Sequence, residues 1–128
     1  MKKLGFYKDL RGPNLPSLSD LQPLVKRGEP LDEAIQQYLN AGIWLYKMRT
    51  QFTCPMTSDF IGTPVVYTDG EWFWTTEYIF YVNRYQIDIP DDFLLKMKSS
   101  SFKVPTESEL GEEALANLQE EIRNHGYK

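Results

Sequence analysis

Residue types that perform chemistry are sparse in this chain of 128 residues, and its carboxylates are the main exception. Asp69 with Glu71, and Asp91 with Asp92, are close enough in sequence to share protons as an acid and a base. Each pair also has a structural explanation, because Asp69 suits a tight turn and adjacent acids favour the start of a helix. We therefore expect no catalytic residues, although a carboxylate-based enzyme stays open as an alternative.

Nucleophiles, metal ligands and phosphate loops are represented only by isolated residues. The single histidine, His125, stands near the end of the sequence and the single cysteine, Cys54, lies in a loop, so neither a metal site nor a Cys-His pair is predicted. One cysteine excludes an internal disulfide and is typical of a reducing compartment. Gly62-Thr63 is followed by Pro64 and lacks the lysine of a phosphate-binding loop. The sequence predicts no cofactor and no metal.

Charge is unevenly distributed along the chain. Residues 1–50 carry 8 basic and 5 acidic residues, whereas residues 51–128 carry 6 and 13, for a net charge of −4. Between positions 59 and 92 the one base is Arg84, and the acids are Asp59, Asp69, Glu71, Glu77, Asp88, Asp91 and Asp92. This balance disfavours contact with a nucleic-acid backbone and favours a basic protein partner. A solvated surface that keeps the protein soluble is the simpler alternative.

Length and hydropathy indicate one cytoplasmic domain over residues 1–128. The start, MKKLGFYKDL, lacks the apolar run of a signal peptide, and no stretch reaches the length needed to span a bilayer. Of the 18 aromatic residues, 12 lie between Trp44 and Tyr85, so the core is expected in the middle third. The sequence does not indicate an oligomeric state.

The carboxylate pairs must be positioned by a small α+β fold. Alternation in IWLYKMR predicts a strand over about 43–49, with Trp44, Tyr46 and Met48 on one side. Asp69-Gly70 between two β-prone runs predicts a hairpin of strands 64–68 and 71–74, with Tyr67 opposite Trp72 and Val65 opposite Trp74. We expect a three-stranded, mainly antiparallel sheet, with both hairpin tryptophans on one face covering the core. Residues 50–64 are expected to form a long loop, either mobile or functional.

Three to five helices are expected to pack on this sheet. Apolar spacing predicts helices over about 31–41, 75–86, 90–98 and 107–124, the last beginning with a Thr106/Glu109 capping box and either docking on the domain or binding a partner. A weaker pattern suggests a short helix from Ser19 or Asp20 to Arg27. Residues 1–16 are expected to be an irregular arm and residues 99–106 a connector. On the second hairpin face, Phe73 is either core, if a helix covers it, or part of an exposed contact patch.

Two segments, YLNAGIWLYKMRTQ and IGTPVVYTDGEWFWTTEYIFYVNRYQIDIPDDFLLKM, resemble a family of small bacterial proteins. The family pattern is T-D-G-x-W-x-W, four further residues, a Tyr-rich helix and an L/I-P-x-x-F ending. It matches at Thr68, Asp69, Gly70, Trp72, Trp74, Phe80, Tyr81, Val82, Tyr85, Ile89, Pro90 and Phe93. The family commonly has Pro at the position of Thr75, and Lys-Tyr-His where this chain has Arg84, Tyr85 and Gln86. These proteins are similar to immunity proteins of contact-dependent growth inhibition and other polymorphic toxin systems.

The resemblance implies a protein that binds a cognate toxin domain in the cytosol and covers or distorts its active site. Together with the charge pattern it predicts stoichiometric inhibition of a basic, nuclease-like domain. We expect the partner contacts at Asp59, Asp69, Glu71, Phe73, Asp88, Asp91 and Asp92. A small regulatory or scaffold module that binds a protein unrelated to toxins is the alternative.

Overall fold

The computed structural model describes residues 2–11 and 15–124 of the protein, which fold as an α+β domain. The strands are β1 (Lys2–Leu4), β2 (Ile43–Lys47), β3 (Phe52–Thr53), β4 (Phe60–Gly62), β5 (Val65–Thr68) and β6 (Trp72–Thr75). The helices are α1 (Lys8–Arg11), the 3-10 helix η1 (Leu18–Leu21), α2 (Glu33–Asn40), α3 (Thr76–Arg84), α4 (Asp91–Ser99), α5 (Glu107–Leu110) and α6 (Glu112–Asn124). No helix in the described ranges is both long and apolar enough to cross a membrane.

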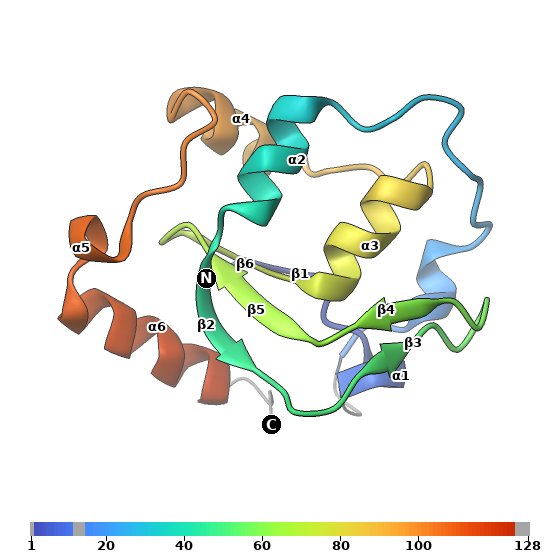
Figure 1. Cartoon of the computed structure of the whole chain (residues 1–128), viewed down its shortest axis with the longest axis horizontal. Helices are drawn as coiled ribbons and strands as arrows, with labels where there is room; N and C mark the ends of the chain where they lie inside the picture. The colour runs from blue at the N-terminus through green and yellow to red at the C-terminus, as the bar shows by residue number, and fades with distance from the viewer. Residues whose placement is uncertain (1, 12–14, 125–128) are drawn as a thin grey trace.

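The main sheet is mixed and has four strands in the order β1-β6-β5-β2 (Figure 1). The β2–β5 and β5–β6 pairs are antiparallel, as the sequence predicted, and β1 pairs with β6 in parallel. The irregular arm expected over residues 1–16 is therefore wrong for its described part, which contains β1 and α1. A three-residue strand is too short to show periodicity in sequence; its pairing partner is supplied by the edge of β6.

The central hairpin is confirmed, but its register differs from the predicted one by two residues. Thr68 lies opposite Phe73 and Tyr67 opposite Trp74, whereas the sequence placed Tyr67 opposite Trp72. The turn is longer than two residues because the Asp69 carboxylate accepts hydrogen bonds from the backbone of the turn. A shift of two residues leaves every side chain on its original face. The prediction that both tryptophans share a face is therefore correct despite the wrong register.

The two tryptophans lie in the first core, beneath α2, α3 and α4. Trp72 and Trp74 are buried, and the Trp72 ring stacks on Phe93 of α4 at a centroid distance of 4.8 Å. The Trp74 indole N–H donates to the backbone carbonyl of Leu39 at 3.0 Å. Buried rings of this size contribute much of a small domain's apolar burial, and the N–H has the partner that burial requires. Trp72 and Trp74 are structural, as expected from the alternation.

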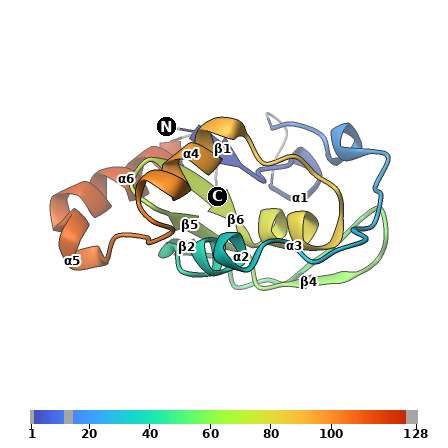
Figure 2. The same ribbon diagram turned by 90° about the horizontal axis from the view of Figure 1, so that it is seen from above.

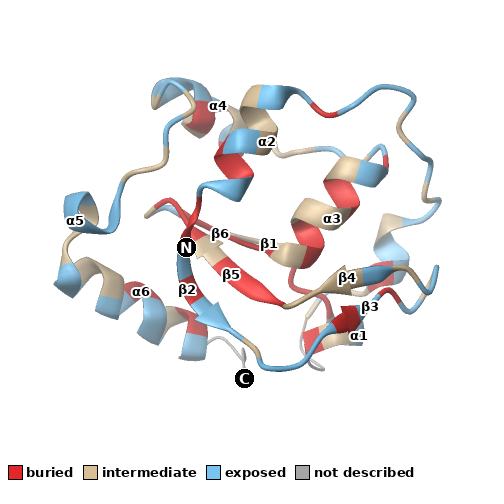
Figure 3. Cartoon of the chain, in the orientation of Figure 1, coloured by how far each residue is buried: buried red, intermediate tan, exposed pale blue. Residues whose placement is uncertain are grey.

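A second core lies on the opposite face of the sheet, covered by α6. Phe73 is completely buried there, against Leu118 and Ile122 of α6. In Figure 1, α2, α3 and α4 lie in the upper half of the view and α6 at the lower left, beside β2. The core alternative for Phe73 is thus correct, and the contact expected between Phe73 and a partner is contradicted by its burial. Figure 3 shows the same division, with buried residues along β5 and exposed ones on the outer side of α6.

The helices agree with the predicted ranges, with two corrections, and the expected loop needs a third. The helix expected near Ser19 is the single 3-10 turn η1, capped by Ser17. The C-terminal helix is divided at Gly111, whose φ of +89° ends α5 immediately after the confirmed Thr106/Glu109 capping box. The long loop over 50–64 contains β3 and β4, which pair as a separate antiparallel ribbon. Figure 2 shows β4 at one end of the molecule and α5 with α6 at the other.

Candidate functional site

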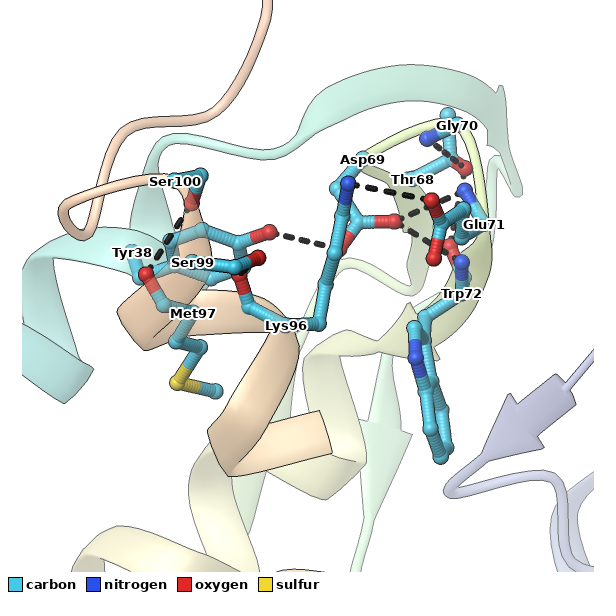
Figure 4. Close-up of polar contacts among 10 residues, drawn as sticks. All are labelled: Tyr38, Thr68, Asp69, Gly70, Glu71, Trp72, Lys96, Met97, Ser99 and Ser100. Atoms are coloured by element: carbon cyan, nitrogen blue, oxygen red, sulfur yellow. Dashed lines mark hydrogen bonds and ion pairs between the residues drawn. The ribbon is translucent and has the colours of Figure 1, made fainter. Parts of the chain in front are cut away.

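Asp69 is a buried structural link, which corrects its expected role as a partner contact. Its side chain accepts hydrogen bonds from the backbone N–H groups of Glu71 (2.9 Å) and Trp72 (2.8 Å) and from the Tyr38 hydroxyl (2.5 Å). Figure 4 shows the carboxylate between the turn and Tyr38 of α2. Burial, followed by the hydrogen bond to Asp69, raises the pKa of Tyr38. With 2 % of Asp69 exposed, its charge holds the turn against α2 and cannot meet a partner.

A second group of acids is exposed but already paired with basic residues of the same chain. These pairs join residues that are far apart in sequence, so the charge pattern alone did not reveal them. Exposed pairs of this kind contribute little to stability, yet each places a cation beside the carboxylate. The pairs, with their N···O distances, are Asp59 with Arg84 (3.6 Å), Glu71 with Lys96 (3.3 Å) and Asp92 with Lys2 (3.4 Å).

A third group of acids surrounds a groove of about 930 Å³. Asp88 and Asp91, both expected contacts, line it together with Glu29, which the sequence did not single out. The side chains of these acids form no hydrogen bond or ion pair with another described residue. We call this feature the acidic groove; its lining residues are Arg27, Gly28, Glu29, Pro30, Ile35, Gln86, Ile87, Asp88, Ile89, Pro90, Asp91 and Leu94.

One wall of the acidic groove is a short antiparallel contact between two loops. The Arg27 amide donates to the Arg84 carbonyl at 3.0 Å, and the Gln86 amide donates to the Val25 carbonyl at 2.7 Å. The Arg27 side chain donates through Nε to the carbonyl of Val82, at the end of α3. Nε of this guanidinium is therefore engaged with the backbone, and these contacts hold the wall in place.

The lining of the groove combines acidic and apolar side chains. Aliphatic surface is provided by Pro30, Ile35 of α2, Ile87, Ile89 and Leu94 of α4. Lysine and arginine side chains combine an apolar stem with a cationic end, so they match both parts of such a surface. The arrangement suits a basic, extended segment of another protein better than a compact anion or a nucleic acid.

The sequence identified some of this groove and missed the rest. Asp88 and Asp91 were named, but Asp59, Glu71 and Asp92 do not line it. Glu29, Pro30 and Ile35 come from the segment before α2 and from α2 itself, and the other apolar residues come from the loop before α4 and from α4. No local pattern links that segment to the loop before α4, because they meet only through the contact between the two loops.

Other chemistry-bearing residues do not form a reactive cluster in the described ranges. No group of three or more His, Cys, Asp or Glu side chains there is arranged to hold a metal ion, and His125 lies outside the described residues. Cys54 is buried and accepts a hydrogen bond from the Tyr81 hydroxyl at 2.9 Å. Burial raises the pKa of the Cys54 thiol, but hydrogen bonds from Thr57, Tyr81 and nearby backbone amides outweigh it and lower the pKa. With 1 % of Cys54 exposed, a substrate has no access to this thiol.

Comparisons with protein-family models, curated proteins and solved structures find no match for this chain. The resemblance to immunity proteins rests on the motif residues quoted above and stays a prediction. Any functional conclusion is therefore drawn from the geometry of the chain itself, and the acidic groove is the surface feature with the most specific chemistry.

Proposed function

We propose that this protein is an immunity protein that neutralises a cognate, basic toxin domain in the cytosol by forming a stoichiometric complex with it. The observation that supports the proposal is the acidic groove, where the carboxylates of Glu29, Asp88 and Asp91 share a lining with apolar side chains and form no ion pair with another described residue. A cationic segment of the toxin lies in this groove in the complex. Covering that segment blocks or distorts the toxin's active site.

The unpaired state of these carboxylates is the reason for choosing this surface over the other acids. A partner cation that approaches Asp59, Glu71 or Asp92 has to compete with the base already beside it. A cation that approaches Asp88 or Asp91 meets a carboxylate that forms no ion pair with another described residue. Unscreened charge of this kind accelerates association and selects a partner of opposite sign.

The apolar residues of the groove supply affinity that charge alone does not. Charges on the rim of an interface change mainly the association rate, whereas well-packed apolar contacts at its centre slow dissociation. Ile35, Ile87 and Leu94 line the same groove as the carboxylates, and in the complex they contact the stems of lysine or arginine side chains. The groove therefore combines the two requirements of a tight inhibitor complex.

The test is co-expression of the protein with the C-terminal domain encoded immediately upstream. Growth rescue together with a stable 1:1 complex supports the proposal, and a folded protein that neither rescues growth nor binds refutes it. The groove is then tested with the double variant Asp88→Asn/Asp91→Asn. The matched control is Asp59→Asn/Glu71→Gln, which removes the same charge from acids that are already paired.

The two double variants are expected to differ in their association rates. Neutralising the groove should lower the association rate about tenfold at low salt, with a smaller effect at high salt, because steering by exposed charge is screened. The control should remain within about twofold of the natural protein, since paired exposed acids contribute little net charge at their position. Equal losses in both variants would place binding outside the groove.

A further inference from the structure

A β-bulge in the edge strand β2 brings an exposed tryptophan and a lysine onto one face of the main sheet. Trp44 lies opposite Tyr67 of β5, and Lys47 lies opposite Val65. Leu45 has no partner on β5 and is the extra residue of the bulge. Because Tyr67 and Val65 are two positions apart on one strand, the residues opposite them share a face. Regular alternation without the extra residue would direct Lys47 to the other face, so the bulge places it on the side of Trp44.

Trp44 differs from the other two tryptophans of the chain in being open to solvent. It is 57 % exposed, whereas Trp72 and Trp74 are 5 % and 0 % exposed. The Trp44 ring meets Tyr67 edge-on at a centroid distance of 6.3 Å, and Lys47 Nζ lies 5.7 Å from the Trp44 ring centroid. Tyr67 stacks in turn on Trp74 of the first core, with ring centroids 6.3 Å apart. A large ring that a core-packed neighbour holds in place and that stays accessible is typical of the anchors at protein interfaces.

The charge of this surface is positive, in contrast to the acidic groove. We call Trp44, Lys47 and Tyr67 the β2 platform. Lys47 is the one charged residue of strands β2 and β5, and Arg49 follows two positions later. Both bases are exposed, and neither forms an ion pair with another described residue. An ammonium beside an indole stays charged and attracts carboxylates. The β2 platform therefore complements an anionic group that arrives next to an apolar side chain.

The number of cations favours an acidic protein segment over a nucleic acid as the partner. A tightly bound nucleic acid engages on the order of 6–10 phosphates. Here the available bases are Lys47 and Arg49, on a chain whose net charge of −4 repels a polyanion. One or two carboxylates are enough to engage these bases, and an aromatic side chain between the carboxylates is able to pack against the exposed indole. We propose that the β2 platform binds an acidic segment of another protein that carries aromatic residues between its carboxylates.

This proposal does not depend on the proposed inhibition of a toxin, and it is tested on the isolated full chain. The probe is the peptide acetyl-EFEFE-amide, and acetyl-QFQFQ-amide is the matched peptide with the same rings and no charge. Each peptide is titrated into the 15N-labelled protein, and tryptophan fluorescence is followed in parallel because Trp44 is the exposed indole. Saturable amide shifts are expected at residues 43–48 and 65–68 with submillimolar acidic peptide. The neutral peptide should bind about three- to tenfold more weakly at low salt, as expected for one or two exposed ion pairs.

Three variants at exposed positions separate the β2 platform from loose association. Trp44→Ala should weaken binding of both peptides about tenfold, because it removes the ring on which they pack. Lys47→Gln should weaken the acidic peptide about two- to fivefold and leave the neutral peptide unchanged. Lys98→Gln removes an exposed lysine of α4 that forms no ion pair with another described residue, and it should change neither affinity.

The possible results divide clearly between support and refutation. The proposal is overturned by an absence of saturable shifts at millimolar acidic peptide, by equal affinities for the two peptides, or by equal losses in Lys47→Gln and Lys98→Gln. Tighter binding of octathymidylate than of the acidic peptide would assign the β2 platform to a nucleic acid. Shifts at residues 43–48 that depend on protein concentration alone would assign it to a second copy of the chain, and either result also overturns the proposal.

Discussion

Replacing Glu77 with leucine tests how the N-terminal segment is held on α3. The carboxylate of Glu77 accepts two hydrogen bonds from the Arg11 guanidinium, one through Nε and one through Nη2 at 2.8 Å. The two side chains are 0 % and 1 % exposed, and the guanidinium carbon lies 5.3 Å from the centroid of the Phe52 ring. In the sequence, Glu77 is only one of the acids between positions 59 and 92. In the structure it is the buried partner of a residue 66 positions away.

The expected magnitude follows from this burial. Removing one partner of a buried, bidentate pair leaves the other charge without compensation and costs about 3–5 kcal/mol. Domains of this size have a total unfolding free energy of about 5–15 kcal/mol. Glu77→Leu should therefore remove a large share of the stability and lower the melting temperature on the order of 10–20 °C. The exposed pair Asp59 and Arg84 is the matched control, and Asp59→Ala should cost less than about 1 kcal/mol.

Urea denaturation measures both variants, and a double variant tests the reasoning. Arg11→Met/Glu77→Leu removes both charges and replaces them with apolar groups, so it should be more stable than Glu77→Leu alone by about 2 kcal/mol. The single variant Arg11→Met is measured as well. If the losses in unfolding free energy of Arg11→Met and Glu77→Leu add up to the loss of the double variant, the side chains do not act as a pair. A loss below about 1 kcal/mol in Glu77→Leu would show that the pair is solvated in solution.

Three further predictions concern the turn, the end of α4 and alkaline pH. In urea denaturation, Asp69→Ala should lower the unfolding free energy by about 3 kcal/mol and Asp69→Asn by about 1 kcal/mol. The smaller loss is expected because the Asn side-chain oxygen still accepts from the turn and its amide is able to donate to Tyr38. Equal losses in the two variants would contradict this reasoning. Ser101 has φ +55°, so Ser101→Gly should raise the urea midpoint by the equivalent of about 0.5–1 kcal/mol, whereas the helical control Ser99→Gly should lower it. Burial raises the pKa of Tyr7 from 10.0 to about 12, so the stability linked to its proton is complete below pH 10 and is lost as the pH rises from 10 to 12. The fall of the urea midpoint across that window should be smaller in Tyr7→Phe, and an unchanged slope would refute the assignment.

The hairpin shows which parts of the fold could be predicted. Alternation placed Trp72 and Trp74 on one face, and this was correct because side-chain direction in a strand is a local property. The register was wrong because the turn is shaped by Asp69, whose third hydrogen bond comes from Tyr38 in a helix 31 residues earlier. A two-residue Asp-Gly turn is the better local choice, and the tertiary contact overrides it.

Short elements held by distant partners could not be predicted. Strand β1 has three residues and exists because β6 offers an unpaired edge, and β3 with β4 forms a ribbon inside what looked like a loop. By contrast, helix α3 has enough length for its spacing of buried residues to be read directly. Tyr78, Tyr81 and Val82 are buried as that spacing predicted.

The acids show the same limit for the candidate site. Counting carboxylates treats Asp59, Glu71 and Asp92 as equal to Asp88 and Asp91, yet the first three lie beside a base and the last two do not. The partners of the paired acids are separated from them by 25 to 90 positions, so no local pattern shows which charges are cancelled. The sequence therefore named the correct class of residue and only part of the correct surface.

Local cancellation changes what the net charge of −4 means for a partner. A diffuse acidic surface attracts any polycation, whereas acids that are already paired offer it little. In the acidic groove, Glu29, Asp88 and Asp91 share one lining with aliphatic side chains, so a cation gains most there when it arrives on an aliphatic stem. In the proposed complex, selectivity for one basic segment over others would follow from the shape of the groove, because charge alone does not distinguish one basic protein from another.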